Sequence, residues 1–237
     1  MKGIRLLGAA LLASTTLLGS TSVFAEVSQP STPSPANAET PVSAVLTINQ
    51  TPTEPQPPTD PEGGTDEGTG ITSLFGIAYA PKALSGTAVL QETGQTEVAL
   101  TNNSATNTNN KYNVGVQDKT RAKDRNWTLS AQLEWTGDAQ DYMEGATITA
   151  SEGNVRLNDG TGTLTSITEG EVTTDAVSLT ITTSAPTIIL NAQKGKTVNG
   201  VYNYQFKDPK LVIPTSEKVA AGTYTGSINW SLSDVVE

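Results

Sequence analysis

The last complete strand pattern of this chain constrains its fold more than any other feature. The segment YTGSINWSLSD, residues 224–234, places its large apolar residues on even positions and its Ser, Thr and Asn residues on odd ones. This period of two is typical of a β-strand with one buried face. Trp230 and Leu232 stand two residues apart, so their side chains are expected on the same face of that strand.

The same pattern occurs about a hundred residues earlier in NWTLSAQLEW, residues 126–135, where Trp127 and Leu129 form a second W-x-L. From Ile71 onward, short runs rich in Val, Ile, Thr and Tyr alternate with turn formers, and TAVLQ, residues 87–91, is one of these runs. Asn158 to Gly160 predicts a tight hairpin, whereas the only helical candidate is a turn at 216–221. The sequence therefore predicts an all-β domain, a β-sandwich or distorted barrel of short, mostly antiparallel strands.

The first 25 residues have the organisation of a secretory signal peptide. Lys2 and Arg5 precede an apolar run, and Val23-Phe24-Ala25 has the form of a cleavage site. The apolar run is too short to span a bilayer, and no later run approaches the necessary length. We expect a secreted protein without a transmembrane segment in the mature chain.

Residues 26–70 differ in composition from the rest of the chain. They hold nine of the 13 prolines and seven acidic residues, with no Lys or Arg. This composition predicts an extended proline/acid-rich spacer or a long surface loop. Inside it, VSAVLTIN at 42–49 is strand-like, and is either a docking strand or an apolar patch in a linker. The β domain itself is expected at 71–237.

Charge and composition exclude several classes of function. Removing Lys2 and Arg5 with the signal lowers the basic count from 14 to 12, so the net charge becomes −12 against 24 acidic residues. This balance argues against a nucleic-acid partner, which requires a basic footprint. The chain has no Cys, so hydrophobic burial must stabilise an exported domain without disulfides.

Catalysis and metal binding have little support in the sequence. Because there is no His and no Cys, the usual general base, the thiol nucleophile and most zinc sites are excluded. Carboxylate pairs can hydrolyse a glycan or hold calcium, but the acidic residues stand in turn-like segments without a recognised spacing. These residues are Asp138, Asp141, Glu144, Glu169 and Glu171. We expect no enzyme, no cofactor and no metal site.

Several ordered features resemble the WxL-domain proteins of low-GC Gram-positive bacteria. They are Phe75-Gly76, DKTRAKDRNWTLSA with the first W-x-L, EGATI at 144–148, and LVIPTSEKVAAGTYTGSINWSLSD with the second. The resemblance covers roughly residues 71–237. It implies a domain held non-covalently at the cell surface by peptidoglycan or a wall glycopolymer, often beside other WxL-type or WxL-interacting surface proteins. The chain departs from the family pattern after Asp234, where a proline commonly follows.

The four W-x-L residues, Trp127, Leu129, Trp230 and Leu232, are the candidate ligand-binding residues. Two interpretations stay open at this point. They either form core between two paired strands, or present an indole face to a sugar ring or to an apolar patch on a partner. Trp135 belongs to no W-x-L and is a weaker candidate.

A second candidate contact is the basic segment before Trp127, which includes Lys119, Arg121, Lys123 and Arg125. It is either a contact for an anionic wall polymer or acidic partner, or a solvated loop with local ion pairs. The leading function is non-catalytic, non-covalent binding to the cell wall, consistent with the absence of an LPxTG-like signal after Leu232. The alternative is a structural subunit that reaches the surface by docking on another exported protein, with its Trp strands or a sheet edge as the interface. A glycan hydrolase is the third class.

Overall fold

The computed structural model describes residues 35–102, 104–122, 124–197 and 199–234. The chain divides into two units, residues 1–45 and residues 46–237. Of the first unit, residues 35–45 are described and contain no helix or strand. The predicted signal peptide lies outside the described residues.

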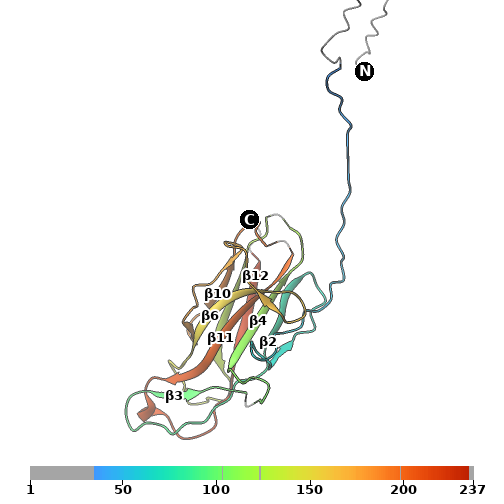
Figure 1. Ribbon diagram of the computed structural model, residues 1–237. Coiled ribbons are helices and arrows are strands. Elements are labelled where there is room, and N and C mark those ends of the chain that lie inside the picture. Colours follow the sequence, from blue (N-terminus) through green and yellow to red (C-terminus); the bar gives the residue numbers. More distant parts are fainter. Residues whose placement is uncertain (1–34, 103, 123, 198, 235–237) are drawn as a thin grey trace, which may run out of the picture. The chain divides into compact units, whose positions relative to one another are not determined.

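The second unit is an all-β domain built from two sheets (Figure 1). The larger sheet has the strand order β1-β2-β4-β11-β6-β7, with β3 also paired to β11 and β9 to β6, and the smaller has the order β12-β5-β10-β8. Every strand pair in both sheets is antiparallel. The larger sheet contains β1 (Asp66–Gly68), β2 (Phe75–Pro81), β3 (Thr96–Ala99), β4 (Lys111–Asp118), β6 (Thr147–Asn158), β7 (Leu164–Thr165), β9 (Leu179–Ile181) and β11 (Gly200–Ile213). The smaller contains β5 (Trp127–Trp135), β8 (Val172–Thr173), β10 (Thr187–Ala192) and β12 (Gly226–Asp234).

The core lies between the two sheets and follows the period of two. In β5, the residues from Trp127 to Leu133 alternate between fully buried apolar side chains and half-buried polar ones. In β11, Tyr202, Tyr204 and Phe206 point into the same core. The ring centroids of Trp127 and Tyr202 are 5.8 Å apart, which joins β5 to β11. The prediction of an all-β fold is confirmed.

The central strands β4 and β11 are buried on both faces, and the face away from the core is polar. Buried amide side chains on it belong to Asn113, Gln117, Asn203 and Gln205. Tyr79 crosses this face beside Gly115, where an added Cβ would stand 2.3 Å from Tyr79 Cζ. The Tyr79 hydroxyl donates to Asn203 Oδ1 at 2.9 Å and accepts from Asn158 Nδ2 at 2.9 Å.

The polar face is covered by residues 53–68, which we call the proline strap. Its backbone carbonyls accept hydrogen bonds from the buried amides: Glu62 O accepts from Asn113 Nδ2 at 2.8 Å and from Gln205 Nε2 at 2.7 Å. Gln56 O accepts from Asn158 Nδ2 at 2.9 Å. A proline-rich backbone lacks many N–H groups but keeps its carbonyls, so it suits a surface of amide donors.

The sequence predicted a spacer or a long surface loop up to residue 70. Residues 53–68 lie on the domain, as a surface loop does, but β1 begins before the boundary expected at 71. The strand-like run at 42–49 forms no strand, and Val42, Val45 and Leu46 are 90–93% exposed. TAVLQ, residues 87–91, is also not a strand.

Other local predictions agree with the structure. Leu157 pairs with Thr165 and Asn158 with Leu164, so the hairpin around Asn158 to Gly160 is present. The helical candidate at 216–221 contains a 3-10 turn, η1 (Ser216–Lys218).

Candidate functional site

The two W-x-L strands are direct neighbours. β12 pairs with β5 over nine consecutive residue pairs without a bulge, from Gly226 opposite Trp135 to Asp234 opposite Trp127. Leu232 stands opposite Leu129, whereas Trp230 stands opposite Ala131. The structure therefore brings the two motifs together, with the leucines as cross-strand partners and the indoles offset along the strands.

Trp127 is a core residue. Its side chain is 0% exposed and packs against Phe75 as well as Tyr202. Its indole nitrogen donates to Asp118 Oδ2 at 3.3 Å and to Thr197 Oγ1 at 3.2 Å, and both of these residues are buried. Because ring and N–H are both satisfied inside the domain, Trp127 has no surface to offer a ligand.

The other three motif residues differ in how deeply they are buried. Leu129 on β5 is fully buried. Trp230 and Leu232 on β12 are only half-buried, although their side chains face the core side of the sheet. One side of the Trp230 ring contacts Phe206, with centroids 6.3 Å apart. The cause is position, since β12 is the last strand of its sheet whereas β5 is an inner one.

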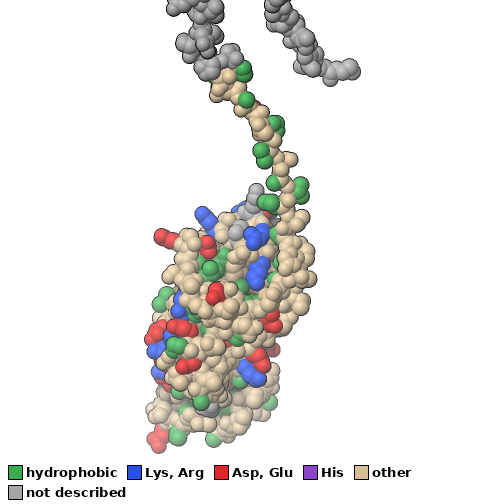
Figure 2. Space-filling view, turned by 45° about the vertical axis from the view of Figure 1, so that its right-hand side comes forward, with side chains coloured by type: hydrophobic (Ala, Val, Ile, Leu, Met, Phe, Trp, Pro, Cys, Tyr) green, Lys and Arg blue, Asp and Glu red, His purple; other side chains and the backbone are tan. Residues whose placement is uncertain are grey.

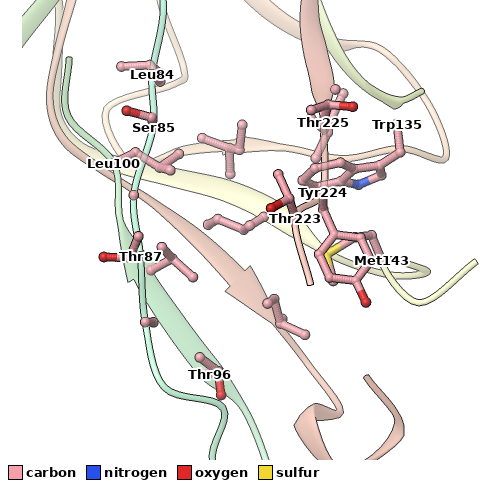
Figure 3. A pocket seen from close by; sticks show the side chains of 18 of the residues that line it. Leu84, Ser85, Thr87, Thr96, Leu100, Trp135, Met143, Thr223, Tyr224 and Thr225 are labelled. Atoms are coloured by element: carbon pink, nitrogen blue, oxygen red, sulfur yellow. The ribbon is translucent and has the colours of Figure 1, made fainter. Parts of the chain in front are cut away.

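Trp230 lines a groove of about 1140 Å³ at the open side of the two sheets. One wall is the segment from Leu84 to Leu90, which is fastened beside β3 by two hydrogen bonds between the backbones of Ser85 and Thr101. The opposite wall is the segment before β12, with Thr223, Tyr224 and Thr225, together with the end of β5 (Figure 3). Of the residues that line the groove, Lys82 alone is charged.

Trp135 and Tyr224 supply further aromatic surface to this groove. Figure 3 shows Trp135 and Tyr224 together on one side, with Leu84, Thr87 and Leu100 on the other. The Trp135 indole nitrogen is buried without a hydrogen-bond partner in the described structure. The sequence analysis gave Trp135 less weight than the W-x-L residues, because its place at a strand end did not reveal the segment that lines the other side of the groove. The nearest signal was its position at the end of the same alternating run as Trp127.

The residues of the predicted basic contact have different surroundings in the structure. Arg125 forms an ion pair with Asp234 at 3.1 Å and lies over the Phe75 ring at 4.3 Å, so it fastens the end of β12 to the larger sheet. Lys119 is half-buried and donates from Nζ to Thr53 O in the strap at 3.4 Å. Arg121 is exposed, and Lys123 lies outside the described residues. Figure 2 shows positive and negative side chains interspersed over the visible face of the domain.

Asp138, one of the carboxylates considered for catalysis or calcium, stabilises a turn. Asp138 accepts the backbone N–H groups of Tyr142 and Met143 at 2.8 and 2.7 Å, which fixes the turn after β5. Among the described residues, no group of three or more Asp, Glu, His or Cys side chains is arranged to hold a metal ion. Nor does the described part of the chain contain a helix with the length and apolar character needed to cross a membrane.

The comparison with family models decides the class of the protein. The model of the WxL domain, described as surface cell wall-binding, matches residues 32–235. The chain belongs to the WxL domain family. The description of this family as surface cell wall-binding places the chain among cell-surface proteins of a wall-binding class. No curated protein and no solved structure matches the chain.

Proposed function

We propose that this WxL protein is retained at the cell surface by direct, non-covalent binding of a wall glycan, peptidoglycan or an associated glycopolymer, in the groove beside β12. In this proposal the predicted signal peptide, residues 1–25, exports the chain, and the strap and β domain together form the binding unit. The observation that carries the proposal is the groove itself, which is lined by three aromatic residues. Trp135 comes from the end of β5, Tyr224 from the segment just before β12, and Trp230 from β12.

The chemistry of the groove favours a sugar chain. Aromatic rings bind the C–H faces of sugars, and the hydroxyl groups of Ser85, Thr87, Thr223 and Thr225 supply hydrogen-bonding partners at the rim. The volume of about 1140 Å³ exceeds that of a typical small-molecule pocket, which suits a polymer segment. Because Lys82 is the one charged residue of the lining, recognition of an uncharged stretch of glycan fits better than recognition of phosphate groups.

The experiment is a pull-down on purified sacculi from a foreign Gram-positive species. Such sacculi offer glycan but no native protein partner. We expect the folded Trp135→Ala and Trp230→Ala variants to bind at least about tenfold more weakly than wild type, equivalent to about 1.4 kcal/mol. Ile188→Ala is the matched control, because Ile188 is an apolar residue of the same sheet, 58% exposed and outside the groove.

Two outcomes would contradict the proposal. Folded variants that bind sacculi as wild type does would remove the groove from the site. Wild-type binding that appears only after addition of a second exported protein would instead support the structural-subunit function. Near-UV circular dichroism of each variant establishes that it is folded before its binding is interpreted.

A further inference from the structure

The floor of the groove beside β12 is made of side chains from the core between the two sheets. Six apolar residues of this floor are at most 7% exposed, although they border an open volume of about 1140 Å³. They come from β3, β5, β6 and β11 and from the segments beside these strands: Val98, Leu100, Leu133, Met143, Ile148 and Ile213. A ligand that reaches this floor therefore contacts the apolar interior of the domain rather than its surface.

The polar side chains of the groove are either exposed or already bonded. Thr96 is the buried one, and its hydroxyl is shared with Ser216 Oγ at 2.6 Å and accepts the Gln91 N–H at 2.9 Å. The other hydroxyls among the described lining residues belong to exposed Ser85, Thr87, Thr223, Thr225 and Ser227. A sugar ring on the floor would lose the hydrogen bonds of its hydroxyls with water and gain no partners. The floor therefore suits a different part of the ligand from the rim.

A hydrocarbon chain fits this floor better than an apolar peptide does. Each residue of a peptide brings a backbone N–H and C=O group, and these groups need partners when they are buried. The backbones of the floor are already paired: Val98 and Ile148 both lie opposite Leu211. Leu133 lies opposite Ile228. A hydrocarbon chain has no polar group to satisfy, and each methylene group removed from water adds to its binding.

We propose that the groove holds an amphiphile, with an acyl chain along the floor joined to an uncharged sugar at the rim. The sugar lies against Trp135 and Tyr224, so this inference rests on the proposed function and adds the acyl chain to it. Lys82, the one charged lining residue, is paired with Glu67 at 3.1 Å. The head group therefore needs no negative charge, and the ligand class is an acylated, uncharged glycan.

Isothermal titration calorimetry with alkyl maltosides of increasing tail length tests the proposal. The chain from Glu26 onward is titrated below the critical micelle concentration of each maltoside. We expect the Kd to fall at least about fivefold for each two methylene groups added, until the tail fills the floor. The heat-capacity change of binding should become more negative along the same series, because more apolar surface is buried. Maltose without a tail should bind at least about a hundredfold more weakly than the longest maltoside.

A pair of matched variants locates the tail. Leu100 lies on the wall opposite Trp135 and Tyr224 (Figure 3), so Leu100→Trp fills part of the floor. It should raise the Kd of the longest maltoside at least about tenfold and reduce the dependence on tail length. Ile188→Trp is the control, because Leu and Ile are isomers and Ile188 is 58% exposed and outside the groove. Its effect should stay within about threefold.

Val98→Phe is a second variant that fills the floor, and it replaces Leu100→Trp if near-UV circular dichroism shows that Leu100→Trp is not folded. It should likewise weaken the longest maltoside more than maltose.

Two natural sources carry this chemistry, a membrane glycolipid and an acylated wall glycopolymer. A glycolipid with one acyl chain is the probe for the first. The polymer, before and after alkaline removal of its ester-linked acyl chains, is the probe for the second. Binding of the glycolipid, or loss of polymer binding on deacylation, supports the proposal and identifies the source. A chain that binds neither acylated probe would overturn it.

Two further results would overturn the proposal: a Kd that does not change with tail length, and equal weakening by the floor variant and Ile188→Trp. Sacculi freed of lipid separate this inference from the proposed function. Leu100→Trp should bind them as wild type does, whereas Trp135→Ala should not. Sacculus binding without any dependence on tail length would remove the acyl chain and leave the proposed function standing. Dependence on tail length in a chain that ignores sacculi would contradict the proposed function instead.

Discussion

The indole nitrogen of Trp127 donates a hydrogen bond to Asp118 Oδ2, 3.3 Å away, and neither side chain reaches solvent. Thr197 Oγ1 donates to the same carboxylate oxygen at 3.0 Å, and Thr120 supplies two further donors to Oδ1. A buried carboxylate is costly unless its oxygens are paired. The first W-x-L therefore belongs to a closed network that joins β4, β5 and the turn before β11.

This relationship predicts a difference between the two motif tryptophans in their contributions to stability. Trp127→Ala should lower the free energy of unfolding by about 3–5 kcal/mol, because it leaves a large cavity and removes a donor from a buried carboxylate. Trp230→Ala should cost less, about 1–2 kcal/mol, since that ring is only partly buried and borders the groove. Urea unfolding followed by fluorescence measures both. Equal losses would contradict the assignment of one ring to the core and the other to the groove.

A second prediction concerns the close approach of Tyr79 to Gly115. Gly115→Ala should lower stability by about 2–4 kcal/mol, because the new Cβ would stand 2.3 Å from Tyr79 Cζ and the ring would have to leave its hydrogen bonds with Asn203 and Asn158. Gly222→Ala is the control, since its nearest neighbour, Tyr224 Cε2, is 4.0 Å from the added Cβ. Thermal unfolding of the two variants should separate them clearly. A stable Gly115→Ala protein would show that the tyrosine does not cross the sheet here.

The strap predicts a pH dependence of stability centred on Asp66. Its carboxylate accepts the backbone N–H and the side-chain amide of Asn113 at 3.0 and 2.9 Å. Burial raises the pKa of Asp66 from 3.8 to about 6, against the opposing effect of these hydrogen bonds. The folded chain therefore holds this proton more tightly than the unfolded chain does, so the contribution of Asp66 is complete below pH 3.8 and is lost as the pH rises through about 6.

Asp66→Asn should remove this loss, which is on the order of 2 kcal/mol between about pH 4 and 7. Glu62 provides a comparison of opposite sign. Hydrogen bonding to Arg156 at 2.6 Å is the main cause that holds its pKa near 2 rather than 4.5, so its contribution is present above pH 4.5 and is lost as the pH falls toward 2. Glu62→Gln should reduce only the loss of stability below pH 4.5. Urea unfolding midpoints measured across this pH range test both variants. If the stability of Asp66→Asn falls between about pH 4 and 7 as steeply as that of wild type, the buried position of the Asp66 carboxylate is refuted.

The last prediction concerns the connection between Arg125 and Asp234, which fastens the end of β12. A double-mutant cycle with Arg125→Ala and Asp234→Ala should give a coupling energy of about 0.5–1.5 kcal/mol, because the pair is only partly buried. Arg125→Ala should cost more than Asp234→Ala, since it also removes the guanidinium from the Phe75 ring. Arg121→Glu in the same segment is the control and should leave stability nearly unchanged, because Arg121 is exposed. A coupling energy near zero would argue that the segment is a solvated loop.

Much of the fold followed from local patterns. The alternation in residues 126–135 and 224–234 identified both strands and which side chains share a face, and β5 and β12 confirm this. The contacts of the strap with the domain were not predicted, because a proline-rich composition is equally typical of a free linker. Only the buried amides that donate hydrogen bonds to its carbonyl groups show that it lies on the sheet. Those amides come from Asn113, Asn158 and Gln205, on three strands far from residues 53–68 in the sequence.

The sequence alone determined that two tryptophan–leucine pairs lie on the apolar faces of β-strands, because side-chain direction in a strand is a local property of the backbone. Only the tertiary structure decided which pair is core and which reaches the surface. That depends on whether a strand is an inner or an edge member of its sheet and on which loops and strands lie opposite it. These are long-range contacts, and a pattern of neighbouring residues does not encode them.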